Sequence, residues 1–367
     1  MKTVTNHRVK IGIMSSVPVT PWSFYRDLIR TLKNRGMNVF LASSALPELY
    51  RLQEKLNCEV FPVKICREIS PFRDLVSIVR LSFYFRKHKP DIIHAHTPKG
   101  GLLGMIASYL AGVPHRSYTI HGLPMETATG VKKKLLRLAE WLSCRLATQI
   151  LAVSPSLRRK VLDETICPAA KIQVLGEGSA CGIDLVYFSP SEKTLASGRN
   201  IRAEYNILED AIVIGFAGRI VPDKGIETLV RAFEKVLEQK PDTYLVLVGD
   251  REIVRGQQFS QEIENRLQEN SHIICSGKFV MDIVPYYAAM DIVTLPSHRE
   301  GFGLTLIEAA AMGLPVVATK VTGCVDAVAD GITGILVEPG DVNGLYEAML
   351  RLVKDADLRK RFGEQGR

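Results

Sequence analysis

Closely spaced cysteine pairs are missing from this sequence of 367 residues. Its seven cysteines form no Cys-x-x-Cys pair, and none stands at a metal-binding spacing from the eight histidines. They are Cys58, Cys66, Cys144, Cys167, Cys181, Cys275 and Cys324. A disulfide scaffold and a zinc site are therefore not indicated, and we expect reduced thiols in a cytosolic protein.

Membrane-spanning and secretory segments are also missing. The most apolar long run, residues 100–112, has 13 residues and is too short to span a bilayer. Residues 1–10 are polar and no apolar signal segment follows them, so we expect no secretion signal. No G-x-G-x-x-G follows the first expected strand, residues 10–14, which argues against a dehydrogenase.

The composition is that of a soluble globular protein, with 46% hydrophobic and 23% charged residues, and the length suits two domains. The net charge of +8 is unevenly distributed. Residues 1–185 hold 27 basic and 13 acidic residues, a net charge of +14, whereas residues 186–367 hold 20 and 26, a net charge of −6. The first half is therefore expected to face an anionic partner: membrane phospholipid, a pyrophosphate-bearing acceptor or nucleic acid.

Short apolar strands alternate with amphipathic helices in both halves. In the first half we expect strands at 10–14, 39–42, 60–63, 91–94, 117–120, 149–153 and 172–175, and helices at 22–35, 72–88, 102–111 and 131–147. In the second we expect strands at 212–216, 244–248, 272–275 and 292–295, and helices at 226–240, 260–268 and 281–289. This α/β alternation predicts doubly wound parallel sheets: two Rossmann-like domains, residues 1–185 and 200–367, facing a cleft and joined by a linker at 186–199.

The stretch at 295–317 carries the strongest candidate site. A loop with Glu300 follows an apolar strand, and a helix that includes Glu308 follows the loop. The glycine-rich opening of this helix can present backbone N–H groups to an anion, through Gly301, Phe302 and Gly303. Two carboxylates beside an anion site suit a ligand with both hydroxyls and phosphates. The alternative is an ordinary strand–loop–helix unit with solvated glutamates.

A second candidate follows the first strand of the second half. Arg219 and Lys224 stand on a strand-to-helix turn, where cations and helix N–H groups can converge on a phosphate. A surface turn with routine charges is the alternative.

Several of these segments together resemble a known family. The segments are GRIVPDKG at 218–225, LVGD at 247–250, the run at 286–296 and EGFGLTLIE at 300–308. They resemble the retaining, nucleotide-sugar-dependent glycosyltransferases of family four, of bacterial surface-polysaccharide type, and the resemblance covers nearly the whole chain. It implies the GT-B fold, with an acceptor-side first domain and a nucleotide-sugar-binding second domain.

The resemblance also implies roles for residues of the second half. Arg219 and Lys224 would bind the donor diphosphate and stabilise the leaving group, at a turn that includes Gly218. Glu300 would contact the sugar and Glu308 the ribose hydroxyls, while Gly301, Phe302 and Gly303 would lend backbone N–H groups. Residues 277–279, with Phe279, would line the base.

In the first half, the resemblance implies that His121, at the end of a strand, approaches the donor sugar. His94 and His96 alternate along another strand, but no third metal ligand is evident, so we expect acceptor contact or packing. One departure is clear: many relatives carry a Gly-Gly loop after the first strand, and this chain has no glycine there, so a hydroxyl of Ser15, Ser16 or Thr20 would serve instead. Glu177 is a weaker candidate for a donor or acceptor contact.

No cofactor or metal is expected, because family members work without a catalytic metal. The single Asp-x-Asp, Asp355 to Asp357, falls in an expected surface helix near the last residue. Relatives usually continue with a helix that crosses back onto the first domain, and we expect that segment to be missing here.

Basic residues with aromatic and leucine neighbours at 80–89 and 132–145 are typical of helices that lie on anionic membrane. A solvated helix with one core-facing side is the alternative, and no nucleic-acid-binding module is recognisable. We therefore expect a hexosyl- or N-acetylhexosaminyltransferase at the inner face of the cell membrane, using a nucleotide-sugar donor, most simply UDP-linked, and a lipid-linked or growing saccharide acceptor. A GT-B nucleotide-sugar epimerase and a non-catalytic nucleotide-sugar-binding protein are the alternatives.

Overall fold

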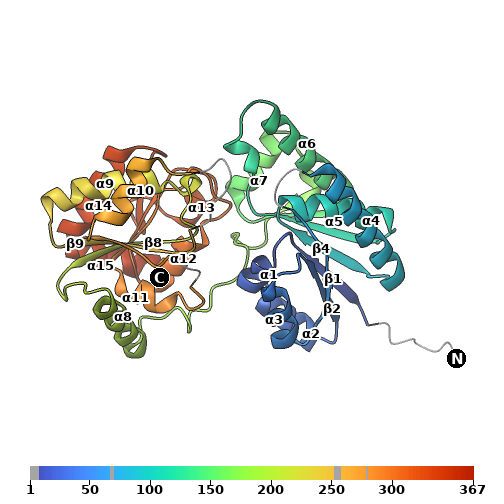
Figure 1. Cartoon of the computed structure of the whole chain (residues 1–367), viewed down its shortest axis with the longest axis horizontal. Coiled ribbons are helices and arrows are strands. Elements are labelled where there is room, and N and C mark those ends of the chain that lie inside the picture. Colours follow the sequence, from blue (N-terminus) through green and yellow to red (C-terminus); the bar gives the residue numbers. More distant parts are fainter. Residues whose placement is uncertain (1–7, 67–69, 252–257, 278–279) are drawn as a thin grey trace. The chain divides into compact units, whose positions relative to one another are not determined.

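The computed structural model describes residues 8–66, 70–251, 258–277 and 280–367. The chain divides into two compact units, Met1–Cys181 and Gly182–Arg367. Each unit is a β-sheet with helices packed on both faces (Figure 1). The expected α/β class with two Rossmann-like domains is confirmed by these two sheets.

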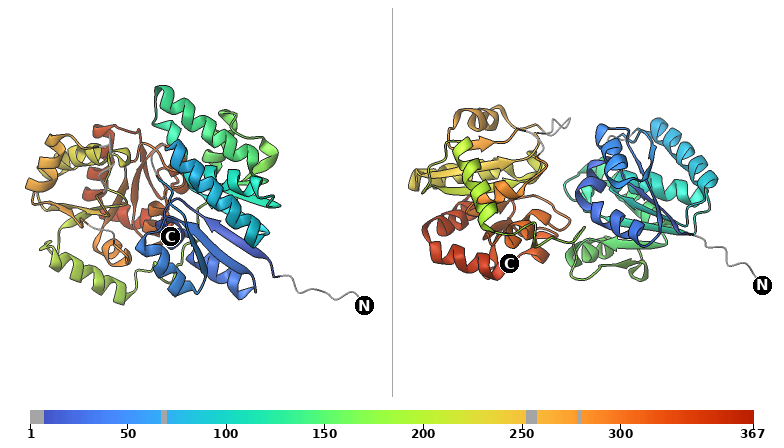
Figure 2. Two further views of the ribbon diagram at one scale, coloured as in Figure 1. Left: turned by 45° about the vertical axis from the view of Figure 1, so that its right-hand side comes forward. Right: turned by 90° about the horizontal axis from the view of Figure 1, so that it is seen from below.

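The first unit contains a seven-stranded, all-parallel sheet in the order β3-β2-β1-β4-β5-β6-β7. Its strands are β1 (Lys10–Met14), β2 (Asn38–Ser43), β3 (Glu59–Pro62), β4 (Ile92–His96), β5 (His115–Ile120), β6 (Gln149–Ala152) and β7 (Ile172–Gln173). Its α-helices are α1 (Val19–Phe24), α2 (Arg26–Asn34), α3 (Pro47–Leu56), α4 (Pro71–His88), α5 (Pro98–Leu110), α6 (Gly130–Leu146) and α7 (Pro155–Asp163). In Figure 2, α1–α3 and α4–α6 lie on opposite faces of this sheet.

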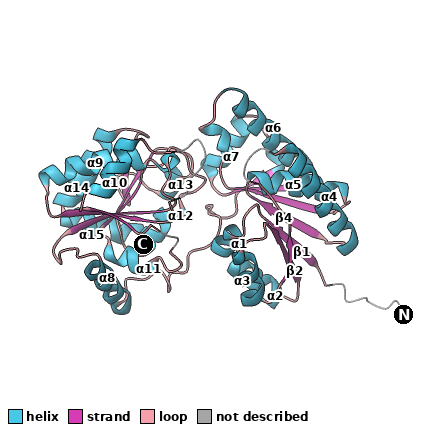
Figure 3. Ribbon diagram, viewed as in Figure 1, coloured by secondary structure: helices cyan, strands magenta, loops and turns pink. Residues whose placement is uncertain are grey.

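The second unit contains a six-stranded parallel sheet in the order β10-β9-β8-β11-β12-β13. Its strands are β8 (Ile212–Ala217), β9 (Thr243–Val248), β10 (Ile273–Cys275), β11 (Ile292–Leu295), β12 (Val316–Thr319) and β13 (Gly334–Val337). Its α-helices are α8 (Glu192–Glu204), α9 (Ile226–Gln239), α10 (Gln261–Glu269), α11 (Val284–Ala289), α12 (Leu304–Ala311), α13 (Cys324–Ala327), α14 (Val342–Lys354) and α15 (Ala356–Gly366), and Figure 3 shows both units by element type. Among the described residues, none of the helices combines the length and the apolarity needed to cross a bilayer.

The strands read as apolar runs because helices cover both faces of each sheet. All four residues of β11 and of β12 are buried. Helix α9 places its apolar side chains three or four residues apart and buries them against the sheet: Ile226, Leu229, Val230, Phe233 and Val236. Each such side chain contributes about 1.5–3 kcal/mol to the free energy of folding.

Each sheet has a point where its strand order reverses. In the first unit β1 lies between β2 and β4, and in the second β8 lies between β9 and β11. Loops that follow the strands on either side of such a point diverge, and their polar groups line a crevice at the carboxyl ends of the strands. The candidate residues at 121, 218–225 and 300–308 all follow strands of these two sheets.

The structure differs from the expected linker at 186–199. Helix α8 begins at Glu192, and Ser191 caps it by accepting a hydrogen bond from the backbone N–H of Thr194. Helix α8 packs on α11, and a Cβ atom on Gly198 would lie 2.4 Å from the Ala288 carbonyl oxygen. The glycine that suggested a linker therefore allows two helices of the second unit to approach closely.

Three local expectations also differ from the structure. The helix expected at 22–35 is two helices, α1 and α2, because Tyr25 leaves helical geometry with φ −125° and ψ 6°. Helices α3 and α7 begin at Pro47 and Pro155, and the sequence pattern did not reveal them. Strand β4 extends as far as His96.

A close backbone approach holds the turn after β8 against the loop after β11. Gly225, at φ +71°, precedes α9, and a Cβ atom there would lie 2.0 Å from the carbonyl oxygen of Pro296. We expect Gly225→Ala to lower the stability by several kcal/mol, because it combines positive-φ strain with this clash. Gly331→Ala is the matched control, since Gly331 has φ +74° and no atom within 4 Å of a Cβ. Thermal unfolding of both variants should show the larger loss at Gly225; equal losses would contradict the close packing.

Candidate active site

Two ion pairs join the turn after β8 to the loop after β11. The turn contains a short 3-10 helix, Pro222–Lys224, that leads into α9. The Lys224 ammonium forms an ion pair with Glu300, and both side chains are mostly buried. The Arg299 guanidinium lies 2.6 Å from the Asp223 carboxylate, and the backbone N–H of His298 donates to the Asp223 carbonyl. The structure thus brings together Lys224 and Glu300, two of the residues that the sequence assigned to one site.

Glu300 has a second partner in the same loop. The buried Ser297 hydroxyl donates a hydrogen bond of 2.7 Å to Glu300 Oε1. Ser297 directly follows Pro296 at the end of β11, so the strand fixes the position of the carboxylate. Sequence reasoning did not select Ser297, Asp223 or Arg299, since nothing in their spacing sets them apart from ordinary loop residues.

Arg219 stands at the start of the same turn and its side chain is exposed. Gly218, before it, has φ +152°. Its carbonyl oxygen would lie 1.9 Å from a Cβ atom on Gly249, so the loops after β8 and β9 also approach closely. The expected cations therefore lie on one turn, at the carboxyl end of the strand where the sheet order reverses.

Helix α12 begins beside this turn. Gly303, at φ +76°, precedes its first residue, and Gly301 is buried. The Thr305 hydroxyl donates to the Ala217 carbonyl at 3.0 Å, which ties the first turn of α12 to the end of β8. The Leu306 N–H donates to the Gly303 carbonyl at 2.9 Å, so the N–H groups just before it, at the very start of α12, are the ones that could serve an anion.

Glu308 lies in α12 and accepts a hydrogen bond of 2.8 Å from the Tyr287 hydroxyl. Burial raises the pKa of Glu308 to about 7, and the Tyr287 hydrogen bond opposes this rise. Burial also raises the pKa of Tyr287 well above its usual value, so the phenol keeps its proton and acts as the donor. Tyr287 is a site residue that the sequence did not single out, because a buried tyrosine in a short apolar helix looks like core. Phe279, expected at the base, lies outside the described residues.

In the first unit, His121 follows β5 and lies beside the two histidines of β4. His121 Nε2 is 3.3 Å from His96 Nδ1 and 2.9 Å from the Tyr25 hydroxyl. His94 Nε2 is 2.7 Å from the Thr119 hydroxyl. Across the described parts of the chain, no group of three or more His, Cys, Asp or Glu side chains is placed to hold a metal ion.

The serines after β1 bond within the protein. The buried Ser15 hydroxyl donates to the Val17 carbonyl at 2.8 Å, and the Ser16 hydroxyl is 2.9 Å from the Thr97 hydroxyl. A Cβ atom on Gly100 would lie 2.9 Å from the backbone nitrogen of Ser16, so the glycine that allows a close approach here stands at the start of α5. Both hydroxyls thus have structural partners in this loop.

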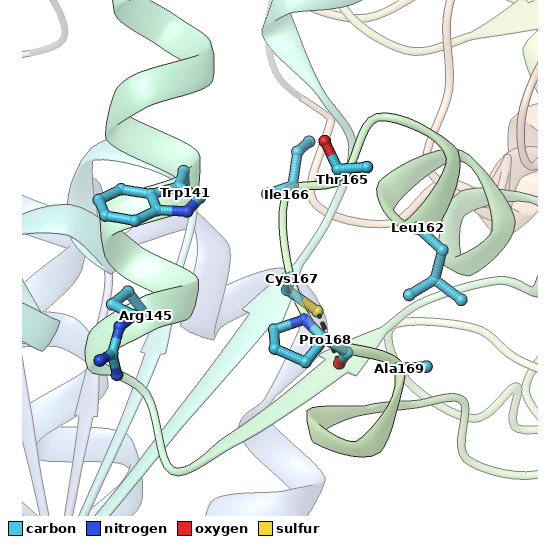
Figure 4. Close-up of a pocket in the computed structure, with 8 residues that line it drawn as sticks. All are labelled: Trp141, Arg145, Leu162, Thr165, Ile166, Cys167, Pro168 and Ala169. Atoms are coloured by element: carbon cyan, nitrogen blue, oxygen red, sulfur yellow. Dashed lines mark hydrogen bonds between the residues drawn. The ribbon is translucent and has the colours of Figure 1, made fainter.

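A surface hollow of about 570 Å³ lies elsewhere on the first unit (Figure 4). Trp141 and Arg145 of α6 line one side, and the segment after α7 lines the other. None of the candidate catalytic or donor-binding residues derived from the sequence lines it, although Trp141 and Arg145 belong to the stretch 132–145 that the sequence marks for membrane binding.

The chain was compared with known families, curated proteins and solved structures. Residues 21–178 match the "glycosyl transferase 4-like domain" and residues 197–367 match "glycosyl transferases group 1". The capsular polysaccharide biosynthesis glycosyltransferase CapM of Staphylococcus aureus is 35% identical over 365 residues, which cover 97% of this chain and 90% of CapM. The Escherichia coli UDP-Gal:alpha-D-GlcNAc-diphosphoundecaprenol alpha-1,3-galactosyltransferase is 29% identical, over 81% of this chain and 75% of that enzyme.

Solved structures show the same fold. Anabaena HepE in complex with UDP and glucose superposes with a TM-score of 0.81 at 22% identity, over 98% of this chain and 94% of HepE. WaaG, a glycosyltransferase involved in lipopolysaccharide biosynthesis, superposes with a TM-score of 0.75 at 17% identity, over 98% of this chain and 94% of WaaG. With both of its units matched by family models and a relative 35% identical along nearly its whole length, the chain belongs to the group 1 glycosyltransferases and has the GT-B fold.

Proposed function

We propose that this glycosyltransferase moves a hexosyl or N-acetylhexosaminyl group, with retention, from a UDP-linked donor to a lipid-linked or growing saccharide in surface-polysaccharide synthesis. The observation that carries the proposal is the pairing of Lys224 with Glu300. It places a cation suited to phosphate beside a carboxylate suited to sugar hydroxyls, at the carboxyl ends of β8 and β11. The UDP bound to HepE and the UDP-Gal named for the E. coli relative support the choice of UDP.

The proposed chemistry is displacement at the anomeric carbon of the sugar. The bond from this carbon to the UDP oxygen breaks, and a bond to the acceptor hydroxyl oxygen forms on the same face. The acceptor proton passes to the departing phosphate, which lies on that face. Arg219 and Lys224 stabilise the charge that develops on the diphosphate, together with the N–H groups at the start of α12, so the reaction proceeds without a metal.

Each remaining residue of the proposed site has one task. Glu300 binds sugar hydroxyls, and Glu308 accepts hydrogen bonds from the ribose hydroxyls once it is ionised. His121 contacts the donor sugar. The backbone of Gly301, Phe302 and Gly303 supplies N–H groups to the donor.

The acceptor is proposed to lie on an anionic membrane surface that the first unit binds from the cytoplasmic side. Helices α4, α5 and α6 pack side by side on one face of the first sheet (Figures 1 and 2). Large apolar side chains are exposed on α4 and α6, including Phe72 at 80%, Phe83 at 67% and Val131 at 74%. Exposed basic residues accompany them on α6, namely Lys132, Lys133, Lys134 and Arg137. Apolar and basic side chains together are typical of helices that lie in an anionic lipid interface.

The two glutamates should respond differently to substitution. Glu300→Ala should abolish turnover without weakening UDP binding, whereas Glu308→Ala should weaken UDP binding by about 1–3 kcal/mol. Because the pKa of Glu308 is about 7, wild-type affinity for UDP should fall as the pH drops below 7, by at most about tenfold per pH unit. Glu308→Gln should lack this fall in UDP affinity at low pH, because its side chain does not ionise. Calorimetric titration with UDP between pH 5.5 and 8.5 measures both effects, and the same response from both glutamates would refute the division of roles.

The two cations should act on the transition state. Arg219→Ala and Lys224→Ala should each slow transfer by about two to three orders of magnitude, as expected when one stabiliser of developing charge is removed. Activity should persist in excess chelator. Product formation from a panel of UDP-sugars, measured by mass spectrometry with a membrane lipid extract as acceptor, is the assay. Loss of activity in chelator with recovery on adding Mn²⁺ or Mg²⁺ would refute the metal-free mechanism, and donor turnover without acceptor would favour an epimerase.

The basic end of α6 should hold the protein on lipid. Replacing Lys132, Lys133 and Lys134 with Glu should release the protein from anionic vesicles and slow transfer to a lipid acceptor, because each cation near the surface contributes about 1 kcal/mol. UDP binding should not change. The matched control replaces three exposed lysines of the second unit, Lys193, Lys354 and Lys360, with Glu. Sedimentation with vesicles of defined anionic content, at low and high salt, is the measurement; equal sedimentation of both triple variants would refute the assignment.

A further inference from the structure

Four rings gather at the carboxyl end of the first sheet, around the proposed catalytic His121. Tyr25 stacks on His96 with ring centroids 4.1 Å apart, and His94 lies 4.1 Å from His96. His96 is fully buried and Tyr25 is 4% exposed. In a cluster of buried imidazoles, the available hydrogen-bond partners determine which ring nitrogens carry protons, because each buried N–H needs an acceptor.

The Tyr25 hydroxyl decides the proton position on His121. Among the described residues, its one hydrogen-bond partner is His121 Nε2, at 2.9 Å. Burial raises the pKa of Tyr25 far above its usual value, so the phenol remains protonated. A buried hydroxyl that fails to donate loses the hydrogen bonds that it had in water. Tyr25 therefore donates to His121 Nε2, and the single proton of the neutral imidazole lies on Nδ1.

His96 supports the same assignment. Its Nδ1 is 3.3 Å from His121 Nε2, and its buried Nε2 has no hydrogen-bond partner in the described structure. A proton on His96 Nε2 would leave an orphaned buried N–H. A proton on Nδ1 instead donates towards His121 and leaves only an unpaired acceptor, which is the more tolerable of the two.

His121 also remains uncharged at neutral pH. Burial, followed by the nearby His94, lowers its pKa to about 4. A neutral imidazole whose Nε2 is occupied by donors can use its Nδ1–H as a donor to a ligand oxygen.

We propose that Tyr25 and His96 are positioning residues that fix His121 with its proton on Nδ1, so that this N–H donates a hydrogen bond to an oxygen of the donor sugar. The proposal rests on the proposed function in one respect, the contact between His121 and the donor. The proton assignment itself follows from the first unit alone.

Tyr25→Phe is the direct test, since it keeps the ring that stacks on His96 and removes the hydroxyl. Tyr244→Phe is the matched control: Tyr244 stacks on His272 with ring centroids 4.8 Å apart, in the second unit and outside the cluster. The full-length protein is labelled with ¹⁵N-histidine, and long-range proton–nitrogen spectra report the tautomer. The His121 signals are assigned by their loss in His121→Asn.

In the wild type, His121 should show a protonated Nδ1 and a bare Nε2. Tyr25→Phe should mix the two tautomers and lower kcat about tenfold, with UDP affinity and thermal stability close to the wild type, and Tyr244→Phe should leave tautomer and kcat unchanged. Protonated Nε2 in the wild type, or unchanged kcat in Tyr25→Phe, would overturn the proposal. Equal losses of kcat and stability in both variants would overturn it as well, by making the hydroxyl merely structural. A wild type with the expected tautomer but no transfer from any UDP-sugar would instead overturn the proposed function and its donor contact.

Discussion

Burial of both faces of two parallel sheets is the constraint on which the rest of this protein depends. Because helices cover each face, the strand side chains must be apolar or must bond internally, as Thr294 does to the Gly215 carbonyl. Charged groups are then displaced to the loops beyond the strand ends. The Lys224–Glu300 pair lies in such loops, and β4 carries two histidines inside the sheet, where burial keeps both uncharged.

Most of the fold could be predicted because buried strands and buried helix faces leave recognisable apolar patterns in the sequence. The bounds of β11 agree with the expected strand, since four buried residues end at a proline. Helices α3 and α7 were missed because each is short, mostly polar and begins at a proline, a pattern shared with surface loops. Residues 192–199 of the expected linker lie in α8, because the lack of a side chain at Gly198 allows the helix to pack closely against Ala288, which the sequence does not reveal.

Residues of the candidate site could be predicted only where a charged side chain lies next to an apolar segment of the sequence. Lys224, Glu300 and Glu308 stood out in this way. Tyr25 and Tyr287 act through contacts with residues far along the chain, and Ser297 acts through Glu300, three residues away; their local sequence resembles core or loop. Proton positions in the histidine cluster are harder still to predict from the sequence, because they depend on which hydrogen-bond partners each ring has once all four rings are packed.

In the proposed site, the ion pair between Lys224 and Glu300 would make ligand entry an exchange of anions. A phosphate that reaches Lys224 replaces a carboxylate that already neutralises it, so the gain in Coulomb energy is a difference between two similar attractions. A small inorganic anion gains little from such an exchange. An extended ligand gains more, because the carboxylate that it displaces becomes free to accept hydrogen bonds from the same molecule. The pairing therefore favours molecules that carry phosphate and hydroxyl groups together over the simple salts of the surrounding solution.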